Sequence, residues 1–172
     1  MDTPPSNMVC QESVYQKLFF AHARHVRNFL CYKGANVDEA EDLMQEAYLR
    51  LWRECEKVPA EKAKSFLFRV ANNLFLDAKK HEQVVLRFQQ KSPNTDQEHE
   101  DPQFIMEAKE LQRELESAIA QLPEKQRTVF LLNRIDKMTY AEIADQLELS
   151  VKAVEKRMSQ ALVEMRKVLK GV

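Results

Sequence analysis

Residues 139–169 constrain the fold most strongly, because their pattern predicts two helices with a very short break between them. Thr139 is a favourable N-cap residue, and Glu142 three positions later completes a capping box for a short first helix. Ser150 is an N-cap residue for a second, longer helix. In that helix apolar residues recur every three or four positions, as on one face of an amphipathic helix: Val151, Val154, Met158, Leu162, Met165 and Leu169. A short helix, a tight turn and a longer helix form the helix-turn-helix pattern.

The opposite face of the longer helix is basic. Six positive charges oppose only two negative ones there: Lys152, Lys156, Arg157, Arg166, Lys167 and Lys170 against Glu155 and Glu164. In helix-turn-helix proteins the second helix enters the DNA major groove with its N-terminal residues, where Lys, Arg and Gln suit phosphates and base edges. We therefore expect the following residues to face DNA: Ser150, Lys152, Ala153, Glu155, Lys156, Arg157, Ser159 and Gln160. The alternative is a solvated basic face on an ordinary helical hairpin.

The turn between these two helices has no glycine. Its residues are Leu147, Glu148 and Leu149, although a turn of this kind often contains glycine. A non-glycine residue must therefore adopt the bend.

Composition predicts an all-α protein, since the chain has only two glycines and few alternating β-type runs. No apolar run approaches the length of a membrane span and no export leader is evident, so we expect a cytoplasmic location. The three cysteines lack CxxC or metal-site spacing, which predicts three reduced thiols: Cys10, Cys31 and Cys55. His22 and His25 are expected to pack or lie at the surface, and no metal or cofactor is expected.

The segment SPNTDQEHEDPQ divides the chain, because it is polar, acidic and bracketed by Pro93 and Pro102. We therefore expect two small helical domains joined by a flexible linker, the second containing the helix-turn-helix. The expected ranges are a flexible tail at 1–12, a helical domain at 13–91, the linker at 92–103 and the second domain at 104–172.

Charge is segregated within the first domain, although the whole chain has a formal net charge of only −1. Five carboxylates crowd residues 36–46, which contain no basic residue: Asp38, Glu39, Glu41, Asp42 and Glu46. That is more than helix capping requires, so we expect this face to dock on a basic surface; a merely solvated face is the alternative. Residues 62–91 are basic and carry Phe66, Phe68 and Phe75, a combination that single-strand binders use, although we expect most of these phenylalanines to belong to the core.

Three segments together resemble a known family: DEAEDLMQEAYLRLW, SFLFRVANNLFLD and LPEKQRTVFLLNRIDKMTYAEIADQLELSVKAVEKRMSQAL. They resemble regions 2 and 4 of a bacterial RNA polymerase sigma factor, and the small extracytoplasmic-function (ECF) group fits best. Region 2 would cover about 13–91 and region 4 about 110–170. The ending VEKRMSQAL further resembles the iron-uptake, FecI-like subgroup.

The resemblance implies roles for particular residues. The acidic helix would bind the β′ clamp helices of the polymerase through Asp38, Glu41, Asp42, Gln45 and Glu46. The loop at 55–64 and the next helix would open the minus-ten element and hold a flipped base, with Arg69, Asn72, Asn73, Lys79 and Lys80 as the candidate residues. The last helix would read the minus-thirty-five element, and region 4 would touch the β flap.

The implied partners are core RNA polymerase, promoter DNA and an anti-sigma factor, which could be membrane-anchored. No small-molecule substrate is implied, and the chain shows no catalytic constellation, so we do not expect an enzyme. Two other hypotheses remain. A stand-alone helix-turn-helix regulator would leave the acidic cluster unexplained, and a structural helical adaptor would leave the basic last helix unexplained.

Overall fold

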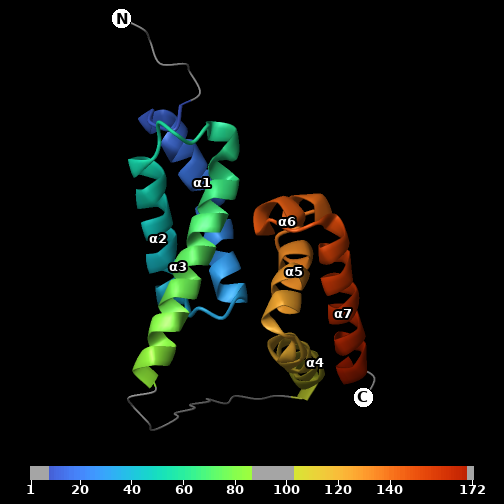
Figure 1. Ribbon diagram of the computed structural model, residues 1–172. Coiled ribbons are helices and arrows are strands. Elements are labelled where there is room, and N and C mark those ends of the chain that lie inside the picture. The colour runs from blue at the N-terminus through green and yellow to red at the C-terminus, as the bar shows by residue number, and fades with distance from the viewer. Residues whose placement is uncertain (1–7, 87–102, 170–172) are drawn as a thin grey trace, which may run out of the picture.

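The structure, a computed structural model, describes residues 8–86 and 103–169, which are helical apart from their connections and one isolated β-bridge (Figure 1). The helices are α1 (Glu12–Tyr32), α2 (Val37–Arg53), the 3-10 turn η1 (Ala60–Lys62), α3 (Ala63–Leu86), α4 (Gln103–Gln121), α5 (Glu124–Arg134), α6 (Tyr140–Leu147) and α7 (Val151–Leu169). The all-α prediction is confirmed. None of these helices has the length and apolar character needed to cross a membrane.

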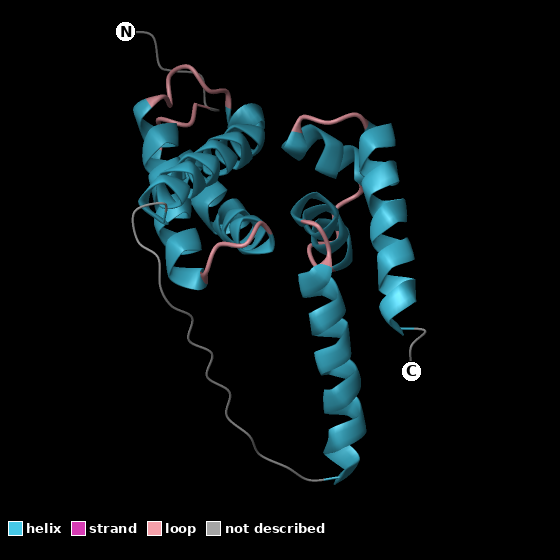
Figure 2. Cartoon of the chain, turned by 60° about the horizontal axis from the view of Figure 1, so that its bottom comes forward, coloured by secondary structure: helices cyan, strands magenta, loops and turns pink. Residues whose placement is uncertain are grey.

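Helices α1, α2 and α3 pack together as the first bundle (Figure 2). Its centre contains Phe29, Leu51 and Phe68, which are almost completely buried. Two tyrosines join α1 to α2: the Tyr15 hydroxyl donates to the Tyr48 carbonyl at 2.8 Å, and the Tyr48 hydroxyl donates to the Leu18 carbonyl at 3.0 Å. These bonds fix the orientation of α2, which carries the acidic cluster.

Helices α4 to α7 form the second group. Ile143, Val154 and Met158 fix the angle between α6 and α7 because they are buried between these helices and α5. A smaller apolar cluster joins α4 to α7 through Ala118, Leu122, Ala161 and Met165. Helices α4 and α5 thus pack against the helix-turn-helix that the sequence predicted.

The two groups contact each other directly. Helix α6 lies against α3, and α5 lies against α1 (Figure 1). The predicted linker at 92–103 falls outside the described residues except for Gln103, which begins α4.

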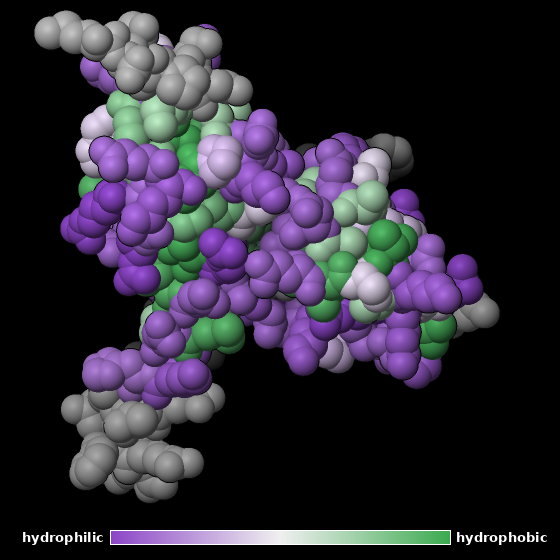
Figure 3. All heavy atoms as spheres, turned by 45° about the horizontal axis from the view of Figure 1, so that its top comes forward, coloured by the Kyte–Doolittle hydropathy of each residue, from purple (hydrophilic) through white to green (hydrophobic). Residues whose placement is uncertain are grey.

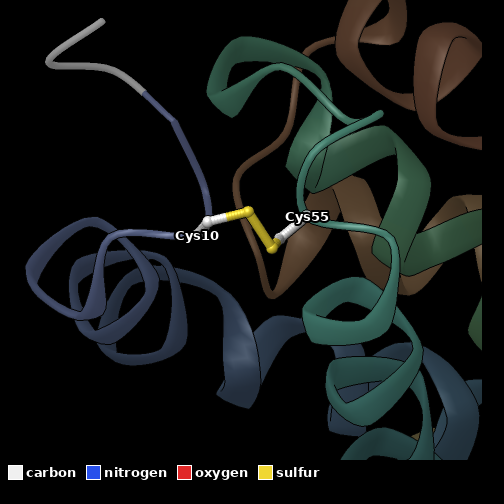
Figure 4. Close-up of a disulfide and its surroundings, with 2 residues drawn as sticks. All are labelled: Cys10 and Cys55. Carbon is white, nitrogen blue, oxygen red and sulfur yellow. A yellow bond between two sulfur atoms is a disulfide. The ribbon is translucent and has the colours of Figure 1, made fainter. Parts of the chain in front are cut away.

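Two of the three cysteines form a disulfide, Cys10–Cys55 (Figure 4). The prediction of three reduced thiols is therefore wrong for this pair, whereas Cys31 has a free thiol. Residues 8–11, expected to belong to a loose tail, fold back onto the connection after α2. Val9 is fully buried there, and Met8 forms a β-bridge with Pro59. This packing places the Cα atoms of the two cysteines 5.0 Å apart, within the range that a disulfide requires.

Candidate nucleic-acid and protein interfaces

The N-terminal half of α7 presents the polar face expected to meet DNA. Ser150 caps the helix, because its Oγ accepts a hydrogen bond from the Ala153 N–H at 3.1 Å. Six of the eight predicted contact residues are exposed: Ser150, Lys152, Glu155, Lys156, Ser159 and Gln160. Ala153 and Arg157 are partly covered, since both lie nearer to the rest of the molecule. The exposed side chains are free to enter a groove.

Glu148 makes the turn that sets the angle between α6 and α7. It has φ 54° and ψ 45°, the left-handed conformation, and its N–H bonds to the carbonyls of Ala144 and Asp145. The expectation that a non-glycine residue tolerates this bend is confirmed. A capping box begins α6 as expected, because Thr139 and Glu142 exchange their backbone and side-chain hydrogen bonds.

One side of α3 carries the residues assigned to the minus-ten element. Arg69, Asn73 and Lys80 are exposed, and Asn72 is half-buried beside them. Their spacing of three, four and seven residues places them on adjoining turns of one helix face. Lys79 lies at the edge of this face, 3.5 Å from Glu39 and 2.9 Å from Glu82. Its pKa is raised, chiefly because its ammonium bonds to the Glu82 carboxylate, with Glu39 adding to the effect.

The five candidate polymerase-binding residues of α2, four carboxylates and one glutamine, lie on its outward side. Asp38, Asp42 and Gln45 are exposed, and Glu41 and Glu46 are half-buried at the edge. Two of the five are paired: Glu41 lies 3.4 Å from Arg27 and Glu46 lies 3.1 Å from Arg50. Asn36 caps the helix by accepting a hydrogen bond from the Glu39 N–H, so capping uses none of the five side chains.

Aromatic and aliphatic side chains extend beside this acidic face. The apolar periodicity of residues 38–54 predicts an inward Trp52, but this side chain is 44% exposed, and Leu49 is 50% exposed. The Trp52 ring packs edge-on against Tyr15, with centroids 5.0 Å apart. Phe20 of α1 is 83% exposed. Figure 3 shows that most of the face in view is hydrophilic, with the apolar surface in separate patches.

The α3 face and the start of α7 come together in a cleft of about 260 Å³. Arg69, Asn72 and Asn73 line it from α3, and Arg157 lines it from α7. Gln146 and Glu148 lie between them. Three residues assigned to the minus-ten element and one assigned to the minus-thirty-five element, Arg157, therefore line the same cleft. Among the described residues, no cluster of His, Cys, Asp or Glu could hold a metal ion.

Comparison with known proteins identifies both halves of the chain. Residues 18–84 match the family described as Sigma-70 region 2, and residues 112–165 match Sigma-70, region 4. The chain is 30% identical over 163 residues to the ECF RNA polymerase sigma factor SigW of Bacillus subtilis, covering 83% of this chain and 82% of SigW. The chain belongs to the ECF sigma factor family.

This sigma factor therefore recognises promoters for the initiation of transcription by RNA polymerase. It is also 25% identical over 156 residues to the ferric citrate uptake sigma factor FecI of Escherichia coli, covering 86% of each chain. Its fold is shared with the sigma factor RpoE of Bartonella quintana, solved in complex with the anti-sigma factor NepR. That comparison has a TM-score of 0.66 at 18% identity and covers 93% of this chain and 98% of the other.

Proposed function

We propose that this sigma factor uses three separate faces: α2 for the polymerase, the start of α7 for the minus-thirty-five element and one side of α3 for the minus-ten element. The division into domains is that proposed from the sequence, with region 2 in 13–91 and region 4 in 104–172. The observation that supports this proposal most directly is the acidic face of α2. Its five residues project outward on one helix, yet helix capping does not require them.

The acidic face is suited to a basic helical partner such as the β′ clamp helices. Asp38 and Asp42 form no ion pair among the described residues, and Gln45 is exposed beside them, so these side chains are available to a partner. The exposed Trp52 and Leu49 lie on the same helix and would add apolar contact area. Charges at such an interface steer association, and buried aromatic side chains contribute most of the binding energy.

The α3 face is suited to separated strands rather than to duplex. Arg69 and Lys80 can bind phosphates, and the Asn72 and Asn73 amides can pair with the edge of an unstacked base. Unstacking a base costs a few kcal/mol, and phosphate and amide contacts would have to offset that cost, because Phe66, Phe68 and Phe75 are buried and cannot stack on bases. The connection at 55–64, which the disulfide fixes at Cys55, would border the flipped base. Opening needs no catalytic group from this chain, and we place its action in the cytoplasm.

An anti-sigma factor is a further proposed partner. The related RpoE was solved in complex with the anti-sigma factor NepR, and a protein of this kind, free or membrane-anchored, would control the present chain. The likeness to FecI and the ending VEKRMSQAL favour the iron-uptake subgroup, and β-flap contact by region 4 follows from family membership.

Charge reversal on α2 tests the docking face. Asp42→Lys together with Glu46→Lys should abolish binding to core RNA polymerase, because the basic partner surface would be repelled. The fold should persist, since substitutions of exposed helix residues cost little stability. The matched control is Glu110→Lys with Glu116→Lys, the same charge change on the exposed side of α4. Co-elution with core polymerase on size exclusion is the measurement. Wild-type affinity of the α2 variant would show that this face is not the docking surface.

A further inference from the structure

We propose that Cys10 and Cys55 are a reversible redox site, and that their disulfide holds the connection at 55–64 in the position needed for strand opening. This inference rests on the proposed function, because that connection is the one assigned to the border of the flipped minus-ten base. The oxidant for such a site is a peroxide, and the reductant is a dithiol. Without the bond, the chain would still bind polymerase but would open promoters more slowly.

The disulfide lies at the edge of the first bundle (Figure 4). Both cysteines lie outside the helices and are only partly buried, so small oxidants and reductants can reach them. The three helices are joined independently of this bond by side chains such as Phe29, Leu51 and Phe68, which are almost completely buried. Breaking the bond should therefore leave the bundle folded and change only its edge.

The bond ties the segment before α1 to the connection between α2 and α3. Two noncovalent attachments accompany it. Met8 forms a β-bridge with Pro59, and the fully buried Val9 belongs to the same apolar cluster as Val58. Reduction would leave only noncovalent contacts between the segment and the connection, so the connection would be held less firmly.

The connection keeps its outer side open to solvent while the bond is formed. Lys57, Pro59 and Lys62 are exposed there, and ammonium groups suit the phosphates beside an unstacked base. Residues that are already held in place bind more tightly, since ordering even one residue on binding reduces an equilibrium constant by a factor of about 5–30. The disulfide therefore promotes opening and does not block it.

The chemistry of the site is balanced with a peroxide and a dithiol. We place the action of this chain in the cytoplasm, where disulfides are usually transient. One thiolate attacks an oxygen of hydrogen peroxide to give a sulfenic acid and water, and the second thiol displaces a second water as the S–S bond forms. Two thiols and one peroxide thus give one disulfide and two waters. A dithiol reverses the step by exchange and itself becomes a disulfide.

Cys31 is the internal control for this chemistry. Its thiol is free, and burial raises its pKa above the ordinary value for cysteine. Because the thiolate is the reactive form, a raised pKa makes this side chain slow to react at neutral pH. Cys31 should therefore stay reduced under the oxidant that joins the other two cysteines.

A count of free thiols tests whether the site is reversible. The reduced full chain, cleared of reductant, should take up three maleimide labels after denaturation, and prior treatment with hydrogen peroxide should leave one. In Cys31→Ser the counts should be two and none, and dithiothreitol should restore both labels. A count that peroxide does not change, or a loss of label at Cys31 in place of the pair, would overturn the inference.

Promoter opening tests what the bond does. Oxidised and reduced full chain, each cleared of reagent, are combined with core RNA polymerase, and the permanganate reactivity of unpaired thymines is followed. The reduced form should open promoters about 5–30 times less well, with polymerase binding and upstream duplex binding unchanged. Cys10→Ser with Cys55→Ser should match the reduced form after either treatment. Cys31→Ser should respond as the wild type does.

The outcomes separate this inference from the proposed function. Equal opening by the two forms, or better opening by the reduced form, would overturn the inference and leave the proposed function standing. Loss of polymerase binding on reduction would show that the bond stabilises the whole bundle, which would also overturn it. If neither form opened a promoter with core polymerase, the proposed function would fail and the inference would fall with it.

Discussion

At the residue scale, Glu148 adopts a backbone conformation that glycine would adopt more easily. A side chain in the left-handed region costs about 1–2 kcal/mol, because Cβ crowds the following carbonyl. Glu148→Gly should therefore raise the free energy of unfolding by about 1 kcal/mol, measured in urea. Glu148→Gln is the matched control, since it removes the charge facing Arg69 and keeps the backbone strain. Stability of the glycine variant no greater than that of the glutamine variant would contradict this account.

Individual side chains show where reasoning from periodicity succeeds and where it fails. Capping residues such as Thr139 and Ser150 were predictable because a cap depends on a few neighbouring positions. The exposure of Trp52 was not predictable. Trp52 lies at the edge of the buried face of α2, where a small rotation of the helix determines whether a side chain is buried or exposed. The Trp52 indole packs edge-on against the Tyr15 ring and does not enter the core, so it stays 44% exposed.

At the scale of elements, the start of α6 depends on a titrating group. The pKa of Glu142 is lowered, chiefly because its carboxylate accepts a hydrogen bond from the Thr139 N–H. A second hydrogen bond, from the Thr139 hydroxyl, lowers it further. A carboxyl group whose pKa is lowered by folding stabilises the folded state at any pH above its pKa in the unfolded chain, about 4.3 for Glu. This contribution is lost as the pH falls through the pKa of the folded state. Glu142→Gln should therefore cost about 0.3–1 kcal/mol at neutral pH, a range expected for a carboxylate near a helix N-terminus.

The difference between Glu142→Gln and the wild type should close in acid, where the wild-type carboxyl is also neutral. Urea unfolding of both proteins at pH 7 and at a pH below the lowered pKa measures it. A difference that persists unchanged in acid would mean that the carboxylate charge does not stabilise the helix start.

The disulfide connects residues 8–11 to the connection between α2 and α3. Cys10 and Cys55 are 45 residues apart, and a crosslink closing a loop of this size stabilises by about 2–4 kcal/mol, mainly by restricting the unfolded chain. Dithiothreitol should lower the free energy of unfolding by that amount in the wild type. The variant with both cysteines replaced by serine should not respond to the reductant. Equal responses would show that the disulfide is not the source of the change.

At the scale of the whole molecule, the sequence predicted the two helical groups but not their contact. Helix positions follow local patterns of capping and periodicity, which a single sequence displays. The pairs Ser65–Asp145 and Lys33–Glu124 join residues 80 and 91 positions apart, and such pairs have no local signature. The Cys10–Cys55 pairing escaped prediction for the same reason. The outward position of most candidate side chains was predictable, because outward charge on an amphipathic helix is a local property.

The two DNA-facing surfaces should act at different steps of initiation. Lys156→Ala and Arg157→Ala alter the first two turns of α7, so each should weaken closed-complex formation by about 1–3 kcal/mol for a base contact and less for a phosphate contact. Asn73→Ala and Lys80→Ala alter α3, so they should leave upstream duplex binding unchanged and slow strand opening. Permanganate footprinting on matched and pre-melted promoters separates the two steps. A pre-melted bubble should partly rescue Asn73→Ala and should not rescue Arg157→Ala, because only the former acts on separated strands. The same rescue for both variants would show that the two faces do not divide the work in this way, even though the chain is a sigma factor.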